Sequence, residues 1–287
     1  MNKLIFLILI FTFANVFAEE AKPKCHLGYK VIDGIKPCTG YIGKSTINSE
    51  SSDIGPISYK KNATGIDFKF YNQDGVQVIP KSYVSNRKEY SDPKKIFFDA
   101  WYVLEGKHES SVIFALDKKF QIENIRPIKN RPLKYEKFSK EEIEKFKLRL
   151  IKTKEGDLSF GYDLKESKPT NLIFYRSEFE DYYVVYVESL RENEIYENHK
   201  LDSYRYLIYN KDNTFIGQYR PGPGEGEAFF NPLFKFSLYG IEYLLASDSD
   251  YLHPLVGSIS LLYRINGKTY WSILGRNMML PFDLDKK

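Results

Sequence analysis

The chain has 287 residues, a formal net charge of +4 and two cysteines. Basic and acidic residues are interspersed along it, which is typical of a solvated surface. The composition therefore excludes a phosphate-binding stripe, and we expect no nucleic-acid partner. The 23 tyrosines and 21 phenylalanines favour β structure first and recognition second, because tyrosine suits half-buried sheet surfaces and interfaces.

The N-terminus has the pattern of a secretory signal peptide. Lys3 supplies a positive charge, residues 4–13 are nearly all apolar, and residues 16–18 form a small-residue cleavage site. A transmembrane anchor is the alternative, but the run is short of the roughly 20 residues that a spanning helix needs. We expect residues 1–18 to be removed. The mature chain is then periplasmic or extracellular, with no transmembrane helix.

Cys25 and Cys38 predict a disulfide. In an exported chain an isolated pair is most simply structural. A redox or metal pair is the alternative, but the spacing is not Cys-x-x-Cys and only His26 lies nearby. We expect residues 19–60, rich in Gly, Ser, Lys and Pro, to form a loop-rich N-terminal segment stapled by this bond. We expect no metal site and no cofactor.

Residues 61–138 are expected to form a first β-rich half. An Asp74-Gly75 turn joins alternating residues on either side into a hairpin. Asn62 begins a glycosylation acceptor tripeptide, which has meaning only in a eukaryotic protein, so its use is left open. Further strands are expected over 96–104, 111–116 and 120–125.

A helix is predicted in the segment 139–155 that links the two halves. Ser139 and Glu142 form a capping box, in which each side chain can bond the backbone N–H of the other residue. The apolar residues that follow have helical spacing and are separated by Lys and Glu. The amphipathic helix is expected over 140–152.

Residues 156–287 are expected to form a second β-rich half. Asn266-Gly267 predicts a type I′ turn, and therefore a hairpin over 259–271. Short turns and consecutive strands predict a mainly β, α+β fold with antiparallel meander-type sheets. Whether the halves are separate domains is left open. The other strands are expected over 171–176, 182–190, 201–219, 234–246, 256–265 and 269–274.

The segment 220–227 must be a loop, because it holds three glycines and two prolines in eight residues. Loops held by rigid strands often carry function. Trp101 and Trp271 lie in expected strands, where they could stack on sugar rings or, more commonly, fill the core. The candidate binding residues are Tyr219, Arg220, Gly222, Gly224 and Trp271.

The segment 209–232 resembles one blade junction of the NHL-type β-propeller repeats. The resemblance rests on Asp212, the pair Ile216-Gly217, the glycine-rich loop, Phe230 and Pro232. It covers about 24 residues once, whereas a propeller repeats its unit every 40 to 50 residues or so. Because the chain shows no second copy, the resemblance predicts no propeller.

Two acidic groups are candidates for chemistry. Asp248, Asp250 and His253 could serve a hydrolytic site, or their oxygens could bind calcium, although the glycine and terminal glutamate of an EF-hand loop are absent. Glu225 and Glu227 could form a glycosidase carboxylate pair. The alternative in both cases is solvated charge on a loop, and it is favoured.

We expect an exported, non-enzymatic protein that binds another protein or a glycan through an aromatic-rich β surface. One alternative is a secreted hydrolase that uses the acidic groups. The other is an outer-membrane β-barrel, prompted by alternating tyrosine-rich segments. The barrel is disfavoured because Lys and Glu fall in many of these segments and the chain ends in Asp-Lys-Lys.

Overall fold

The computed structural model describes residues 23–48, 53–60, 68–86, 97–105, 112–129, 133–153, 172–190, 201–219, 228–250, 259–274 and 277–280. These residues form three antiparallel β-sheets and one helix. The predicted fold class, mainly β with one helix, is confirmed.

The first sheet has eight strands in the order β4-β3-β7-β1-β2-β6-β5, and β18 pairs with β1. Its strands are β1 (Gly40–Asn48), β2 (Asp53–Lys60), β3 (Phe68–Asn72), β4 (Gln77–Val78), β5 (Ser82–Asn86), β6 (Phe97–Val103), β7 (Val112–Asp117) and β18 (Asn277–Leu280).

The second sheet has the order β13-β12-β11-β10-β9, and the third has the order β17-β16-β15-β14-β8. The second contains β9 (Glu136–Lys137), β10 (Leu172–Phe179), β11 (Tyr182–Leu190), β12 (Leu201–Asn210) and β13 (Phe215–Tyr219). The third contains β8 (Glu123–Pro127), β14 (Ala228–Leu238), β15 (Ile241–Asp250), β16 (Ile259–Ile265) and β17 (Lys268–Leu274).

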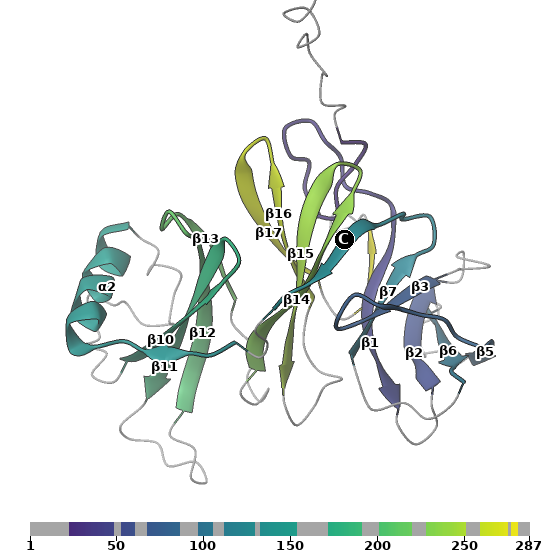
Figure 1. Cartoon of the computed structure of the whole chain (residues 1–287), viewed down its shortest axis with the longest axis horizontal. Coiled ribbons are helices and arrows are strands. Elements are labelled where there is room, and N and C mark those ends of the chain that lie inside the picture. Colours follow the sequence, from purple (N-terminus) through teal and green to yellow (C-terminus); the bar gives the residue numbers. More distant parts are fainter. Residues whose placement is uncertain are drawn as a thin grey trace, which may run out of the picture.

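The elements stack in four layers, with α2 (Lys140–Thr153) outermost and then the second, third and first sheets (Figure 1). The third sheet is the central one. Leu262 packs toward the second sheet, whereas its neighbours Leu261 and Tyr263 pack toward the first. A sheet buried on both faces needs nearly continuous apolar strands. This explains why β16 is buried at every position from Ile259 to Tyr263.

The capping box of α2 is confirmed. The Ser139 backbone N–H donates to Glu142 Oε2 at 2.8 Å, and the Glu142 N–H donates to Ser139 Oγ at 3.3 Å. Phe146 and Leu150 are buried against the outer face of the second sheet. This burial, and not propensity alone, fixes the helix on the sheet.

The predicted type I′ turn at Asn266-Gly267 is confirmed. Both residues have positive φ, 49° and 75°, and Ile265 pairs with Lys268 across the turn. The Asp74-Gly75 hairpin also forms, with a three-residue loop in which the Gly75 N–H bonds the Asn72 carbonyl. Local turn chemistry was sufficient to predict both hairpins.

The expected loop-rich segment 19–60 is wrong beyond Thr39, because β1 and β2 occupy most of residues 40–60. The sequence of β1 is polar, and it mixes Lys44, Ser45 and Thr46 with apolar residues. It forms a strand because β7 pairs along one side and β18 and β2 along the other. These are long-range pairings that the local pattern does not contain.

The second sheet is a meander and so is the run β14 to β17, as predicted, but the first sheet is not. Consecutive strands β6 and β7 both form but do not pair with each other. β6 lies between β2 and β5, and β7 lies between β1 and β3. Pairings also cross the expected halves, since β8 joins β14 and β18 joins β1. The domain boundaries stay a prediction.

Candidate functional site

Asp248 and Asp250 lie in β15, not in the solvated loop that the alternative reading assigned to them. Asp248 pairs with Phe230 and Asp250 pairs with Ala228. Ala228 directly follows Glu227 in the chain. Residues Glu225, Glu227 and His253 lie outside the described residues.

Two of the candidate binding residues, Tyr219 and Trp271, lie in the edge strands of the second and third sheets. Tyr219 is the last residue of β13, and Arg220, Gly222 and Gly224 lie outside the described residues. Trp271 lies in β17, and β13 and β17 approach each other as the edge strands of their sheets. We call this meeting of β13 and β17 the seam.

Trp271 is half-buried in the seam. Its ring meets Phe230 edge-on, with centroids 6.5 Å apart. It also lies against Gly217 of β13, where an added Cβ would come within 2.6 Å of the indole. The indole Nε1 is buried and makes no hydrogen bond within the described part of the chain. A buried donor without an acceptor costs free energy of folding. Such a donor at Trp271 therefore indicates either a site for a binding partner or strained packing.

Nine of the described tyrosines fill the layers of the core. Burial raises the pKa of four of these phenols, those of Tyr71, Tyr182, Tyr243 and Tyr263. They therefore stay neutral and pack as large apolar groups with a polar end. The buried set is Tyr41, Tyr71, Tyr182, Tyr183, Tyr186, Tyr206, Tyr209, Tyr243 and Tyr263.

Cys25 and Cys38 form the predicted disulfide. The loop that the bond closes ends in a tight turn at Asp33-Gly34, whose φ angles are 48° and 81°. Backbone hydrogen bonds of 3.0 and 2.8 Å between Ile32 and Ile35 close the turn. The bond and the turn together hold this loop in one shape.

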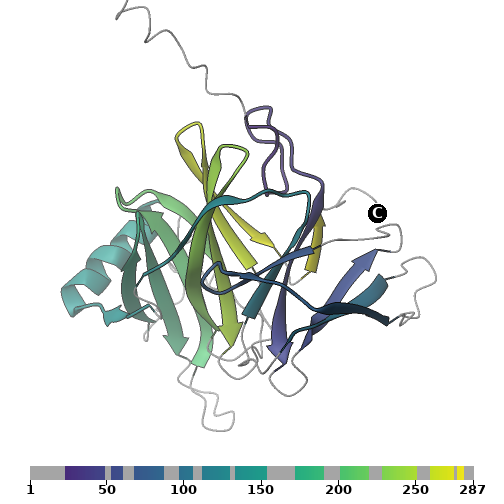
Figure 2. The ribbon, with the colours of Figure 1, turned by 45° about the vertical axis from the view of Figure 1, so that its right-hand side comes forward.

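Two hairpin tips of the third sheet meet the disulfide loop in the upper part of Figure 1, and Figure 2 shows the same arrangement from a second direction. They are Tyr239-Gly240 between β14 and β15, and Asn266-Gly267 between β16 and β17. We call residues 23–38 together with these two tips and Lys268, which directly follows Gly267, the tip cluster. Asn266 Nδ2 donates to Asp33 Oδ2 at 3.0 Å, and the Leu27 N–H donates to the Tyr243 hydroxyl at 3.1 Å.

His26 is buried within the tip cluster. Its Nδ1 accepts a hydrogen bond from the Gly28 N–H at 3.0 Å, and its ring stacks on Tyr263. Burial lowers the pKa of His26, and backbone groups at Lys30 and Ile35 offset this only in part. Nε2 makes no hydrogen bond to any residue that the structure describes. The imidazole is therefore held neutral, and protonation of Nδ1 would break the bond to Gly28.

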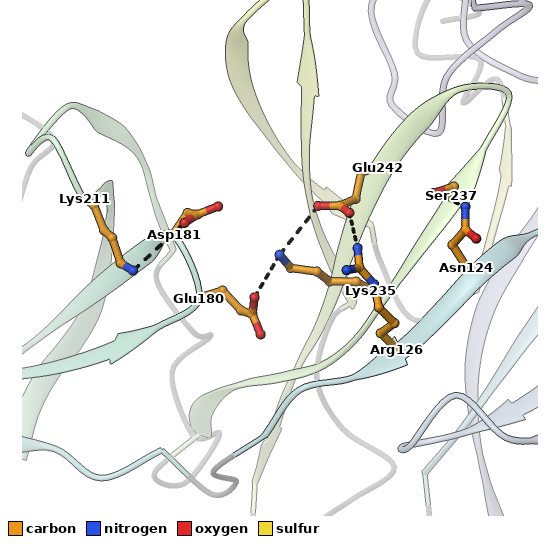
Figure 3. A network of polar contacts seen from close by, with 8 residues as sticks. All are labelled: Asn124, Arg126, Glu180, Asp181, Lys211, Lys235, Ser237 and Glu242. Atoms are coloured by element: carbon orange, nitrogen blue, oxygen red, sulfur yellow. Dashed lines mark hydrogen bonds and ion pairs between the residues drawn. The ribbon is translucent and has the colours of Figure 1, made fainter.

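A charged clamp of four residues bridges the second and third sheets (Figure 3). Lys235 of β14 lies 3.0 Å from a Glu180 oxygen and 3.5 Å from a Glu242 oxygen. Arg126 of β8 pairs with the other oxygen of Glu242 at 2.5 Å. The side chain of Lys235 is only 12% exposed, so water screens this contact less than a surface pair.

The clamp holds its lysine as a cation. Partial burial lowers the pKa of Lys235, but the hydrogen bond to Glu180 and the charge of Glu242 outweigh burial, so the net pKa is raised. A protonated amine is neither a nucleophile nor a base. Glu180 itself has a φ of 52°, a strained value for a residue with a Cβ, and its bond to Lys235 helps to offset that strain. The clamp is structural.

The chain matches no protein-family model, no curated protein and no solved structure. The resemblance of residues 209–232 to NHL-type repeats gains no support from these comparisons. Among the described residues, no helix has the length and apolar character to span a membrane. Nor do three His, Cys, Asp or Glu side chains of these residues lie together as metal ligands.

Sequence reasoning missed the tip cluster and the charged clamp. The turns at Asp33-Gly34 and Asn266-Gly267 can each be predicted from their residues, but the local sequence does not indicate that the two turns are in contact. The clamp joins positions 126, 180, 235 and 242, which only the sheet stacking brings together.

Proposed function

We propose that the protein is exported and that it binds another protein or a glycan through the seam, without catalysis. The signal-type N-terminus and the Cys25–Cys38 disulfide support export, because such bonds persist in oxidising compartments. The seam, with Trp271 and the end of β13 at Tyr219, is the aromatic surface that we expect to make the contact.

The observation that carries this proposal is the unmet indole donor of Trp271. Its Nε1 lies at the junction of two sheet edges, beside Gly217, and no described residue accepts its proton. Tryptophan gives a large contact area together with one hydrogen-bond donor, a combination common in binding hot spots. A small movement of β13 away from β17 would expose both the ring and the donor.

The test uses the two tryptophans of the chain. A Trp101→Phe variant leaves Trp271 as the reporter for fluorescence titration against glycans selected on an array and against proteins captured by cross-linking. Isothermal titration calorimetry with the same ligands gives the affinity of the variants that lack Trp271. Trp271→Ala should weaken binding by roughly 30-fold, the loss typical of a hot-spot residue. Leu148→Ala, at an exposed position on α2, is the matched control. Equal binding by the Trp271→Ala and Leu148→Ala variants would exclude the seam.

A second candidate function, hydrolysis of glycosides, is favoured by one observation. The register of β14 and β15 places Asp250 opposite Ala228, next to Glu227 in the chain. Paired carboxylates are the chemistry of glycosidases. On this hypothesis Asp248→Asn and Glu227→Gln would each abolish release of a chromogenic aglycone by the folded protein. Failure of the parent chain to release any aglycone would end this hypothesis.

A further inference from the structure

The tip cluster is strongly basic. Four exposed lysines lie on it, and none of them forms an ion pair with any residue of the described ranges: Lys24, Lys30, Lys36 and Lys268. The ammonium of Lys24 lies over the ring of Tyr239, 5.7 Å from its centroid. One acidic residue, Asp33, belongs to the cluster, and its carboxylate accepts the hydrogen bond of Asn266. The surface therefore carries cations that no described residue neutralises by an ion pair.

An apolar side chain stands out from this basic surface. Val31 is 61% exposed, whereas its loop neighbours Ile32 and Ile35 are half-buried and buried. An isolated exposed valine has no meaning alone. Here it lies beside Lys30 on a loop that the disulfide and the Asp33-Gly34 turn hold rigid. A rigid apolar projection among lysines combines the two attractions that hold proteins on anionic lipid surfaces.

We propose that the tip cluster docks on an anionic phospholipid surface. Val31 enters the headgroup region, and the four lysines lie among the lipid phosphates. Lysine suits this ligand, because it is a point charge on a flexible stem and needs no fixed bidentate geometry. A soluble polyanion could satisfy the lysines but offers no apolar region for Val31. The docking surface differs from the seam, so the protein can meet a membrane and a partner by separate groups.

The test is co-sedimentation of the disulfide-bonded chain from residue 19 with phosphatidylcholine vesicles, with and without phosphatidylglycerol. The parent chain should bind only the anionic vesicles, and added salt should weaken the binding. Lys30→Glu with Lys36→Glu should lower the affinity at least about tenfold, because each lysine near such a surface contributes on the order of 1 kcal/mol. Val31→Ser should lower it by a smaller factor.

The matched control is Lys129→Glu with Lys134→Glu, which changes the net charge equally at exposed positions between β8 and β9. This control should bind the vesicles as the parent chain does. Equal losses in the two double variants would overturn the proposal, since net charge alone would then explain binding. Absence of binding to anionic vesicles, or retention by soluble polyglutamate only, would also overturn it. Trp271→Ala should leave vesicle binding intact. A failure of the vesicle-binding proposal can therefore be distinguished from a failure of the proposed partner binding at the seam.

Discussion

The charged clamp and the tip cluster are both rich in charge, but their cations differ in whether a carboxylate pairs with them. In the clamp, Lys235 and Arg126 are each neutralised by a carboxylate from another strand or turn. In the tip cluster, four lysines have no such partner within the described part of the chain. Paired, half-buried charge holds sheets together, whereas unpaired, exposed charge is available to a ligand. We therefore assign the clamp to folding and propose the tip cluster for recognition.

The largest expected effect on stability comes from removing the disulfide that holds the tip cluster. Replacing Cys25 and Cys38 by alanine should lower the free energy of unfolding by about 3 kcal/mol, because the open loop gains chain entropy in the unfolded state. Urea unfolding of the variant and the parent chain measures this. A loss below about 1 kcal/mol would mean that turns and packing alone hold the loop.

The clamp should show the next largest effect. Lys235→Ala leaves Glu180 without its cation and Glu242 with Arg126 alone, and it should cost about 1–2 kcal/mol of unfolding free energy. Lys211→Ala is the matched control, because Lys211 lies 4.0 Å from Asp181 and both side chains are well exposed. It should cost less than about 0.5 kcal/mol. Similar losses in the two variants would contradict a structural role for burial at the clamp.

His26 should make the stability of the tip cluster depend on pH. Its pKa is lowered in the folded state, so the unfolded chain binds the proton more readily. Stability should be full above about pH 6.5 and should fall as the pH drops below that value. The groups beside the ring include Tyr263, which stacks on it, and Tyr29, whose pKa burial raises to about 12, so neither is charged in this range.

The measurement for His26 is urea unfolding at pH 7.5 and at pH 5.5 or so in the parent chain and in His26→Gln. The variant should lose part of the difference between the two pH values. An unchanged difference would show that His26 titrates alike in the folded and unfolded states.

The smallest expected effect on stability comes from replacing lysines of the tip cluster. Lys30→Glu with Lys36→Glu should change the free energy of unfolding by less than about 0.5 kcal/mol, because exposed lysines without partners contribute little to folding. Thermal or urea unfolding measures this directly. A loss as large as that of Lys235→Ala would mean that these lysines serve the fold.

The parts of the fold that were predicted from sequence are those fixed by neighbouring residues. The Ser139–Glu142 capping box and the Asn266-Gly267 turn need only a few residues, and both formed as expected. The disulfide was also predictable, because two cysteines have one intramolecular pairing and the signal-type N-terminus predicted an oxidising compartment.

The parts that were not predicted depend on pairing between distant residues. Strand β1 forms from a polar sequence because β7 and β18 flank it, although they lie far along the chain. Asp248 lies in a strand because the β14–β15 register continues beyond Ala246 to Asp250. The tip cluster needed Asp33 and Asn266 to meet, which the stacking of the disulfide loop on the third sheet decides.

The most direct test of the division between folding and recognition measures two quantities on the same two variants. Lys30→Glu with Lys36→Glu and Lys235→Ala are compared in affinity for anionic vesicles and in free energy of unfolding. The tip variant should lose vesicle affinity and keep its stability, and the clamp variant should lose stability and keep its affinity. The reverse pattern, or parallel losses in both variants, would contradict the assignment of the tip cluster to recognition.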